Sequence, residues 1–155
     1  MKINKPTSLP LDQFIEFALY NKDTGYYMKK NPFGKEGDFV TAPNITRLFS
    51  EMIAIWVLTF WKSIGSPKKF NLLELGAGNG EMMKVIIETL KNFSECFDNC
   101  NFQIHEKSEL LKKKQQLNLK SEKITWIEDV KVNNSYPTIF LANEFFDALP
   151  IKQFF

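Results

Sequence analysis

Residues 72–80 read Leu-Leu-Glu-Leu-Gly-Ala-Gly-Asn-Gly, an apolar segment with an acid that leads into three glycines spaced by two. Glycine has no Cβ, so the chain can turn with positive φ and its backbone can lie against a ligand. A helix that begins after such a turn offers unpaired N–H groups at its first residues. The segment therefore predicts a cofactor cradle. Its candidate cofactor-binding residues are Glu74, Gly76, Ala77, Gly78, Asn79 and Gly80.

Three classes of cofactor compete for this turn. A Walker loop requires Gly-Lys-Ser or Gly-Lys-Thr, whereas Gly80 is followed by Glu81 and Met82. The dinucleotide fingerprint requires a third glycine where the chain has Glu81, and a carboxylate at a helix start repels a pyrophosphate. The remaining pattern, acid-x-Gly-x-Gly-x-Gly, resembles the first motif of class I S-adenosylmethionine (SAM) methyltransferases. SAM carries no phosphate, and its sulfonium and ammonium groups tolerate nearby carboxylates.

Acids follow the next two predicted strands. Glu106 follows the strand predicted at 102–105, where a carboxylate can accept hydrogen bonds from two ribose hydroxyls. Each such bond contributes about 1.5–3 kcal/mol, which is enough to anchor a nucleoside. Asp129 follows the strand predicted at 124–127, where such folds place an acid near the adenine amino group. The alternative is that both acids are exposed loop residues.

The residues after the strand predicted at 138–142 are candidates for catalysis. Glu144 and Asp147 are three residues apart and would share one side of a helix. They follow a strand end, where open α/β sheets bind ligands. We expect Glu144 to accept a proton from the substrate, with Asn143 holding the substrate or cofactor. The alternative for Asp147 is that it only caps a turn before Pro150.

An alternation of strands and helices must position these residues. The sequence predicts strands at 70–75, 102–105, 124–127 and 138–142, with helices at 81–93 and 108–119 between them. Strands separated by helices indicate an α/β fold with a parallel, doubly wound sheet. The lysine-rich stretch 112–123 is interpreted as a solvated helix face.

The first part of the chain is expected to be a helical extension. We expect an N-terminal helical segment at 1–68 and a Rossmann-like, cofactor-binding part at 69–155. Within the first part, the spacing of apolar residues predicts a helix at 10–20 and a short strand at 25–28. A second helix, capped by Asn44 or Thr46, is expected to reach about residue 64. It is apolar on most sides, which predicts burial.

Composition limits the function classes. The 155 residues carry twenty Lys and Arg against eighteen Asp and Glu, which gives no reason to expect a nucleic-acid partner. Cys96 and Cys100 are interpreted as free thiols and no metal site is expected. The longest apolar run, 52–61, is far shorter than the about 20 residues that cross a bilayer, so no membrane span is expected. With no signal peptide evident, the sequence predicts a soluble intracellular protein.

The chain resembles the MidA-type family of SAM-dependent methyltransferases. Four segments match that family in order: Gly25-Tyr26-Tyr27, Gly37-Asp38-Phe39-Val40-Thr41-Ala42-Pro43, Glu74-Leu75-Gly76-Ala77-Gly78-Asn79-Gly80 and Ala142-Asn143-Glu144-Phe145-Phe146-Asp147-Ala148-Leu149-Pro150. The resemblance implies a class I methyltransferase fold, SAM as cofactor, and Asp38 and Thr41 closing over it. The structural alternative for these two residues is a helix-entry cap. Mitochondrial members act on a subunit of respiratory complex I, forming symmetric dimethylarginine and aiding assembly. The resemblance therefore suggests a protein arginine as substrate, in the bacterial cytoplasm or, for a eukaryotic chain, the mitochondrial matrix.

The chain departs from this family in length. Members are more than twice as long, and a class I sheet normally has seven strands where four are counted here. We therefore expect a sheet truncated after the fourth strand, with the strand at 138–142 as an exposed apolar edge. Weak SAM binding, little turnover, and self-association or pairing with a missing C-terminal half are expected. The alternatives are a non-catalytic assembly or binding module, an inactive remnant of a split methyltransferase, and a nucleotide-dependent oxidoreductase, which Glu81 disfavours.

Overall fold

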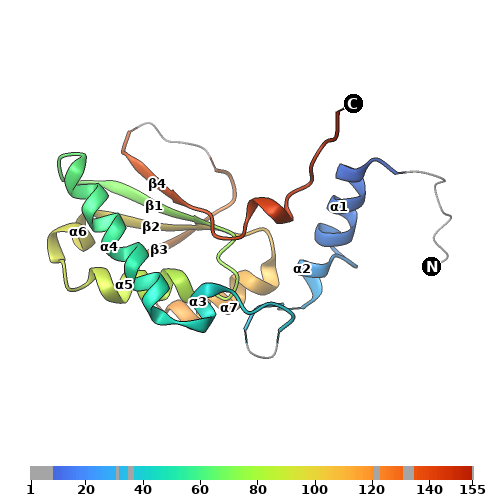
Figure 1. The fold of residues 1–155 in the computed structure, drawn as a ribbon, viewed down its shortest axis with the longest axis horizontal. Helices are drawn as coiled ribbons and strands as arrows, with labels where there is room; N and C mark the ends of the chain where they lie inside the picture. The colour runs from blue at the N-terminus through green and yellow to red at the C-terminus, as the bar shows by residue number, and fades with distance from the viewer. Residues whose placement is uncertain (1–8, 31, 35–36, 121–122, 131–134, 155) are drawn as a thin grey trace.

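A parallel sheet lies at the centre of the computed structural model, which describes residues 9–30, 32–34, 37–120, 123–130 and 135–154. Its four strands are β1 (Phe70–Leu75), β2 (Cys100–His105), β3 (Ile124–Ile127) and β4 (Thr138–Leu141). They lie in the order β3-β2-β1-β4 and every pairing is parallel (Figure 1). The carboxyl ends of all four strands therefore meet at one edge. The predicted α/β fold is confirmed.

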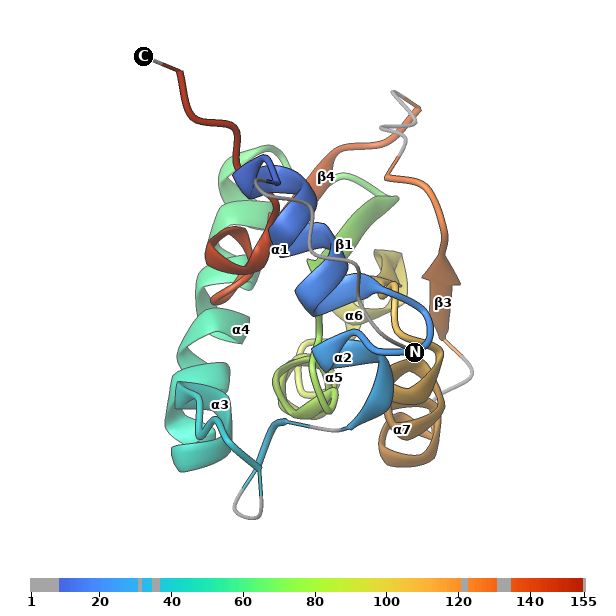
Figure 2. The ribbon, with the colours of Figure 1, turned by 90° about the vertical axis from the view of Figure 1, so that its right-hand side faces the viewer.

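Three helices cover one face of this sheet: α4 (Arg47–Ser63), α5 (Glu81–Leu90) and α7 (Glu109–Leu119) (Figures 1 and 2). The strand residues on that face are buried, including Leu72, Phe102 and Ile139, which stand in register across three strands. Among the described residues, no helix covers the opposite face, where Asn71, Asn101 and Thr138 are joined by side-chain hydrogen bonds of 3.2 Å.

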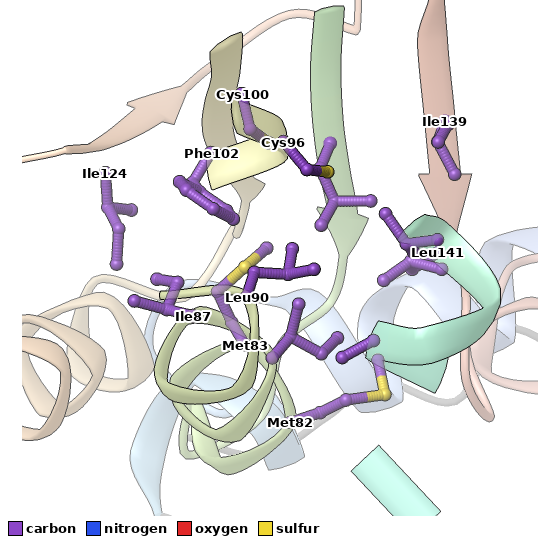
Figure 3. Close-up of a cluster of buried hydrophobic side chains, with 14 of the residues drawn as sticks. Met82, Met83, Ile87, Leu90, Cys96, Cys100, Phe102, Ile124, Ile139 and Leu141 are labelled. Atoms are coloured by element: carbon purple, nitrogen blue, oxygen red, sulfur yellow. The ribbon is translucent and has the colours of Figure 1, made fainter. Parts of the chain in front are cut away.

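The hydrophobic core lies between the sheet and α4 and α5, and it contains both cysteines (Figure 3). Met83 and Leu90 of α5 reach toward the sheet, while Cys96 comes from the short helix α6 (Ser94–Asn99), which the sequence did not predict. Cys96 and Cys100 are both buried and free, as interpreted from the sequence. Burial raises the pKa of Cys96 to about 11, so its thiol stays protonated and unreactive at neutral pH.

Helix α4 begins as predicted but is buried on one side only. Thr46 caps it, because its hydroxyl accepts a hydrogen bond of 3.2 Å from the backbone N–H of Leu48. The residues that face the core are Ser50, Ala54, Val57, Leu58 and Trp61. A second apolar stripe is 41–61% exposed and consists of Leu48, Met52, Trp56 and Phe60. The predicted burial on most sides was wrong, because apolar periodicity does not tell which face of a helix has a neighbour.

Before α4, the regular secondary structure of the described residues consists of three helices. These are α1 (Leu11–Tyr20), α2 (Tyr26–Lys29) and α3 (Ala42–Ile45). The strand predicted at 25–28 was wrong, because a short aromatic run does not distinguish a strand from one helical turn. Trp61 of α4 belongs to the same core as the strands, and its indole N–H donates to the carbonyl of Pro67 at 3.0 Å. The division at residue 68 stays a prediction.

In the part of the chain that the structure describes, no helix has both the length and the apolar character to cross a membrane.

We predict that the exposed stripe of α4, together with the edge strand β4, drives self-association. Trp56→Glu and Phe60→Lys place charges on this stripe at half-exposed positions, so they should change the stability of the fold little. Sedimentation velocity should show a concentration-dependent mass for the unaltered chain and a mass near the 18.1 kDa monomer for the double variant. Leu117→Glu, at a 70% exposed position of α7, is the matched control. A purely monomeric unaltered chain contradicts the prediction.

Candidate active site

The turn after β1 closes only because its glycines adopt left-handed conformations. Gly76, Gly78 and Gly80 have φ values of +65°, +56° and +83°. The N–H of Gly76 donates to the carbonyl of His105 at 2.9 Å, which ties the carboxyl ends of β1 and β2 together. A Cβ on Gly76 would lie 2.6 Å from the ring of Phe145. A side chain at this position is excluded both by the backbone conformation and by the close approach.

This turn lines two adjoining cavities. The larger cavity is bounded by the N-terminal aromatic residues, the end of β2 and the segment after β4. Its lining residues are Glu16, Tyr20, Tyr27, Phe33, Gly76, Gly78, His105, Glu106, Lys107, Ser108, Leu111, Glu144, Phe145, Ala148, Leu149 and Pro150. The smaller is lined by Phe33, Thr41, Pro43, Asn44, Glu74, Gly76, Ala77, Gly78, Asn79, Met82, Asn143 and Glu144. Phe33, Gly76, Gly78 and Glu144 belong to both walls. The two cavities are therefore neighbouring parts of one groove at the carboxyl ends of the strands.

Glu106 lies in the larger cavity with its carboxylate held from two directions. Its Oε1 accepts from the backbone N–H of Ser108 at 2.9 Å and its Oε2 accepts from the side-chain amide of Gln115 at 3.0 Å. Burial raises the pKa of Glu106, and these hydrogen bonds partly oppose the rise. A carboxylate has about four acceptor positions, so acceptor capacity remains for a ligand.

Glu74 lies in the smaller cavity and lacks a partner for one oxygen. Its side chain is 3% exposed, and its Oε2 has no hydrogen-bond partner among the described residues. Burial, with a smaller contribution from the charge of Glu106, raises the pKa of Glu74 to about 8. A buried acceptor without a donor is unfavourable, and such groups are rare in folded proteins. The position therefore favours a ligand that brings a cationic donor.

Asn79 and Thr41 are connected through one polar chain. The side-chain amide of Asn79 donates to Asn44 at 2.8 Å, and that of Asn44 donates to the hydroxyl of Thr41 at 3.0 Å. The Oδ1 of Asn79 also accepts a hydrogen bond of 3.3 Å from the backbone N–H of Glu81, and so satisfies one N–H group at the start of α5. This chain brings the loop of Thr41 against the glycine turn.

The candidate catalytic residues are only partly brought together. Asn143 lines the smaller cavity and Glu144 lines both cavities. Glu144 has a φ of +48°, so the segment is not helical there and the condition for Glu144 and Asp147 to share a helix side is not met. Asp147 lies in the 3₁₀ turn η1 (Phe146–Ala148), is exposed, and is not among the residues that line either cavity.

Asp38 and Asp129 lie away from both cavities. The exposed carboxylate of Asp38 accepts hydrogen bonds from Tyr26 and Lys30, and the Lys30 ammonium is the main cause that lowers the pKa of Asp38. Asp129 is exposed after β3. Neither residue is among those that line the groove. Their roles toward a cofactor stay predictions.

An aromatic wall from the N-terminal segment closes the larger cavity. Tyr27 stacks between Tyr20 and Phe33, with ring centroids 5.8 Å and 6.1 Å apart. The hydroxyl of Tyr20 donates to the carbonyl of Ala148 at 2.9 Å, and Lys107 pairs with Glu16 at 2.7 Å. Burial raises the pKa of Tyr20 to about 12, so it remains a neutral donor. Sequence reasoning did not identify Tyr20, Tyr27 or Phe33 as site residues.

The two phenylalanines that follow Glu144 are not part of the hydrophobic core. Phe145 instead lines the larger cavity against Gly76, and Phe146 is 66% exposed. Among the described residues, no group of three or more His, Cys, Asp or Glu side chains is arranged to hold a metal ion.

The comparisons with known proteins agree with this geometry. Residues 52–155 match the model of a family described as "Putative S-adenosyl-L-methionine-dependent methyltransferase". The chain belongs to this methyltransferase family. The family resemblance carried by the four motifs is thereby confirmed.

Similarity to individual relatives and to a solved structure covers nearly the whole length of the chain. It is 30% identical to the mitochondrial protein arginine methyltransferase NDUFAF7 of Xenopus laevis and 31% identical to the homologue of Drosophila melanogaster, covering 98% of the chain and 40% of each relative. A COG1565 superfamily structure from Burkholderia thailandensis, bound to S-adenosyl-homocysteine, superposes with a TM-score of 0.77 at 24% identity, covering 92% of the chain and 38% of that protein. The chain thus spans about 40% of the length of the curated relatives it matches.

We predict that Glu74 makes the stability of the ligand-free chain fall as pH rises. Its pKa is about 8 in the folded chain, above the value of 4.5 for an unperturbed glutamate. Between these two pH values the folded state therefore keeps a proton that the unfolded chain has released. The contribution is present in full below about pH 4.5 and is lost toward about pH 8, on the order of a few kcal/mol.

Urea unfolding at about pH 5 and about pH 8 measures this loss. Glu74→Gln should remove most of the difference, because an amide does not titrate, while the control Glu95→Gln at an exposed position should retain it. Equal pH dependence in the unaltered chain and Glu74→Gln contradicts the prediction.

Proposed function

We propose that this chain forms the SAM-binding part of a methyltransferase that modifies an arginine side chain of a protein. The observation that carries the proposal is a pair of acids, the buried Glu74 and the partly buried Glu106, in adjoining cavities that share the glycine turn. At these two acids a phosphate-bearing cofactor gains no favourable charge interaction, because an anion disfavours their ionised forms and raises their pKa further. The two acids suit a nucleoside that carries an ammonium group at one end and ribose hydroxyls in its middle.

The chemical character of the groove residues matches the functional groups of SAM. Glu106 would accept from the ribose hydroxyls, and the unpaired Oε2 of Glu74 would accept from the ammonium group. The aromatic wall of Tyr20, Tyr27 and Phe33 offers flat apolar surface to a base. When bound, SAM supplies an electrophilic methyl group on its sulfonium.

The acids at the mouth of the groove favour a cationic substrate. A guanidinium has a pKa above about 12 and must lose a proton to accept a methyl group. Glu144 lies in the turn after β4, exposed and on the wall of both cavities, where it can hold a guanidinium and accept that proton. Asn143 would orient the substrate or cofactor beside it, and Asp147 adds negative charge near Tyr20 and Tyr27.

The names of the relatives support the finer assignment. They are mitochondrial protein arginine methyltransferases, so a protein arginine, in a complex I subunit by the family resemblance, is the proposed target. A mitochondrial matrix location is proposed only for a chain of eukaryotic source; a bacterial chain would act in the cytoplasm. A second function, a binding module without turnover, is favoured by one observation: of the proposed catalytic residues, Asp147 lines neither cavity.

We predict that the chain binds S-adenosylhomocysteine and that Glu106 contributes most of the ribose recognition. Calorimetric titration of Glu106→Gln should show affinity reduced by about tenfold or more, because a charged acceptor is lost. Glu128→Gln, at an exposed position after β3, is the matched control and should bind like the unaltered chain. Equal affinity in Glu106→Gln and the control contradicts the proposed ribose contact. If the unaltered chain does not bind at all, the proposed function is contradicted.

We predict a separate role for Glu144 in transfer. With SAM labelled in its methyl group and an arginine-containing protein as acceptor, Glu144→Gln should lose about 10²-fold or more in transfer while S-adenosylhomocysteine affinity stays within about threefold. Glu128→Gln again serves as the control. Undiminished transfer by Glu144→Gln contradicts its role. An unaltered chain that binds S-adenosylhomocysteine but transfers no methyl group assigns the binding-module function instead.

A further inference from the structure

A buried glutamine on α7 joins three parts of the groove. Gln115 is fully buried, and its amide nitrogen donates at 3.0 Å both to Oε2 of Glu106 and to the carbonyl of Gly78. Its amide oxygen accepts from the indole N–H of Trp126 on β3 at 2.9 Å. One side chain thereby connects the end of β2, the glycine turn and β3.

The partners leave the amide only one orientation. An indole N–H can only donate, so it must face the amide oxygen. A backbone carbonyl and a carboxylate accept, so they must face the amide nitrogen. All three contacts are satisfied at once in this orientation, and all three would be lost if the amide were flipped. Gln115 is therefore a fixed element of the groove.

Packing alone does not require this residue. The neighbouring residues on the inner side of α7 are Leu111 and Leu119, and an apolar side chain at position 115 would continue that surface. A buried amide is favourable only when its hydrogen bonds are made. What these bonds hold is the carboxylate of Glu106, whose terminal torsion has no strong preference of its own, and the carbonyl of the glycine turn.

We propose that Gln115 is a positioning residue that determines ribose recognition, holding Glu106 and the glycine turn in the one arrangement that accepts both ribose hydroxyls. The inference rests on the proposed function, because it concerns the same nucleoside. Gln115 does not itself touch the ligand. Without it, only the bond from Ser108 to Oε1 still holds the carboxylate of Glu106, and Oε2 and the carbonyl of Gly78 lose the amide that fixes them. The ribose hydroxyls then meet an acceptor that is less well aimed at them.

Comparing adenosine with 2′,3′-dideoxyadenosine tests this directly. Both probes would be titrated into the protein by calorimetry, and the ratio of their affinities isolates the two ribose hydroxyls. This ratio does not depend on how much of a variant is folded, because both probes bind the same folded molecules. The unaltered chain should prefer adenosine by at least about tenfold. In Gln115→Met, which keeps the length of the side chain and removes the amide, the preference should fall to within about threefold.

Two further variants make the test decisive. Gln116→Met changes the adjacent, exposed glutamine of the same helix and should retain the full preference. Trp126→Phe removes the donor that orients the amide of Gln115, lies outside both cavities, and should give an intermediate preference. It also decides the question if Gln115→Met does not fold, because an undiminished preference in Trp126→Phe then overturns the inference.

The remaining outcomes separate the inference from the proposed function. An undiminished preference in Gln115→Met, or an equal loss of affinity for both probes, overturns the positioning role. If the unaltered chain binds neither S-adenosylhomocysteine nor adenosine, the proposed function fails and the inference fails with it. If the unaltered chain binds S-adenosylhomocysteine but does not distinguish the two probes, the inference alone fails.

Discussion

The close approach of the glycine turn to its neighbours is the constraint on which the rest of the site depends. Each glycine meets a different part of the chain: a Cβ on Gly76 would lie 2.6 Å from Phe145, one on Gly78 3.3 Å from Phe33, and one on Gly80 3.3 Å from Leu119. The N-terminal loop, the segment after β4 and helix α7 can converge on one point only because no side chain stands there. The turn therefore contributes its backbone to the groove and also determines how closely the other walls of the groove approach.

The same convergence concentrates acids where water is scarce. Burial raises the pKa of both Glu74 and Glu106, and the two differ in how the chain compensates. Glu106 receives donors from Ser108 and Gln115, whereas the Oε2 of Glu74 receives none among the described residues. This asymmetry divides the groove into a part that is already satisfied and a part that a cationic ligand would complete. It also accounts for a site that suits a sulfonium nucleoside better than a phosphate.

Sequence reasoning predicted the elements whose pattern is local. The strands, the helices after Gly80 and Ser108, and the cap at Thr46 follow from apolar runs, glycines and hydroxyl caps in a few consecutive residues. It failed where tertiary contacts decide: the turn of helix at Tyr26 and the uncovered stripe of α4. Gln115 was placed on a solvated, lysine-rich face, although Leu111 and Leu119, four residues before and after it, indicated the buried side. The partners of its amide lie 9 to 37 residues away and no local pattern points to them.

We expect the groove to be shaped around a sulfonium nucleoside. A crystal structure of the chain soaked with S-adenosylhomocysteine tests it most directly. The ligand should lie across the glycine turn, with its ammonium group at Glu74 and both ribose hydroxyls at Glu106. A groove that stays empty under saturating ligand, or that takes NADH in its place with the pyrophosphate at the start of α5, would contradict it.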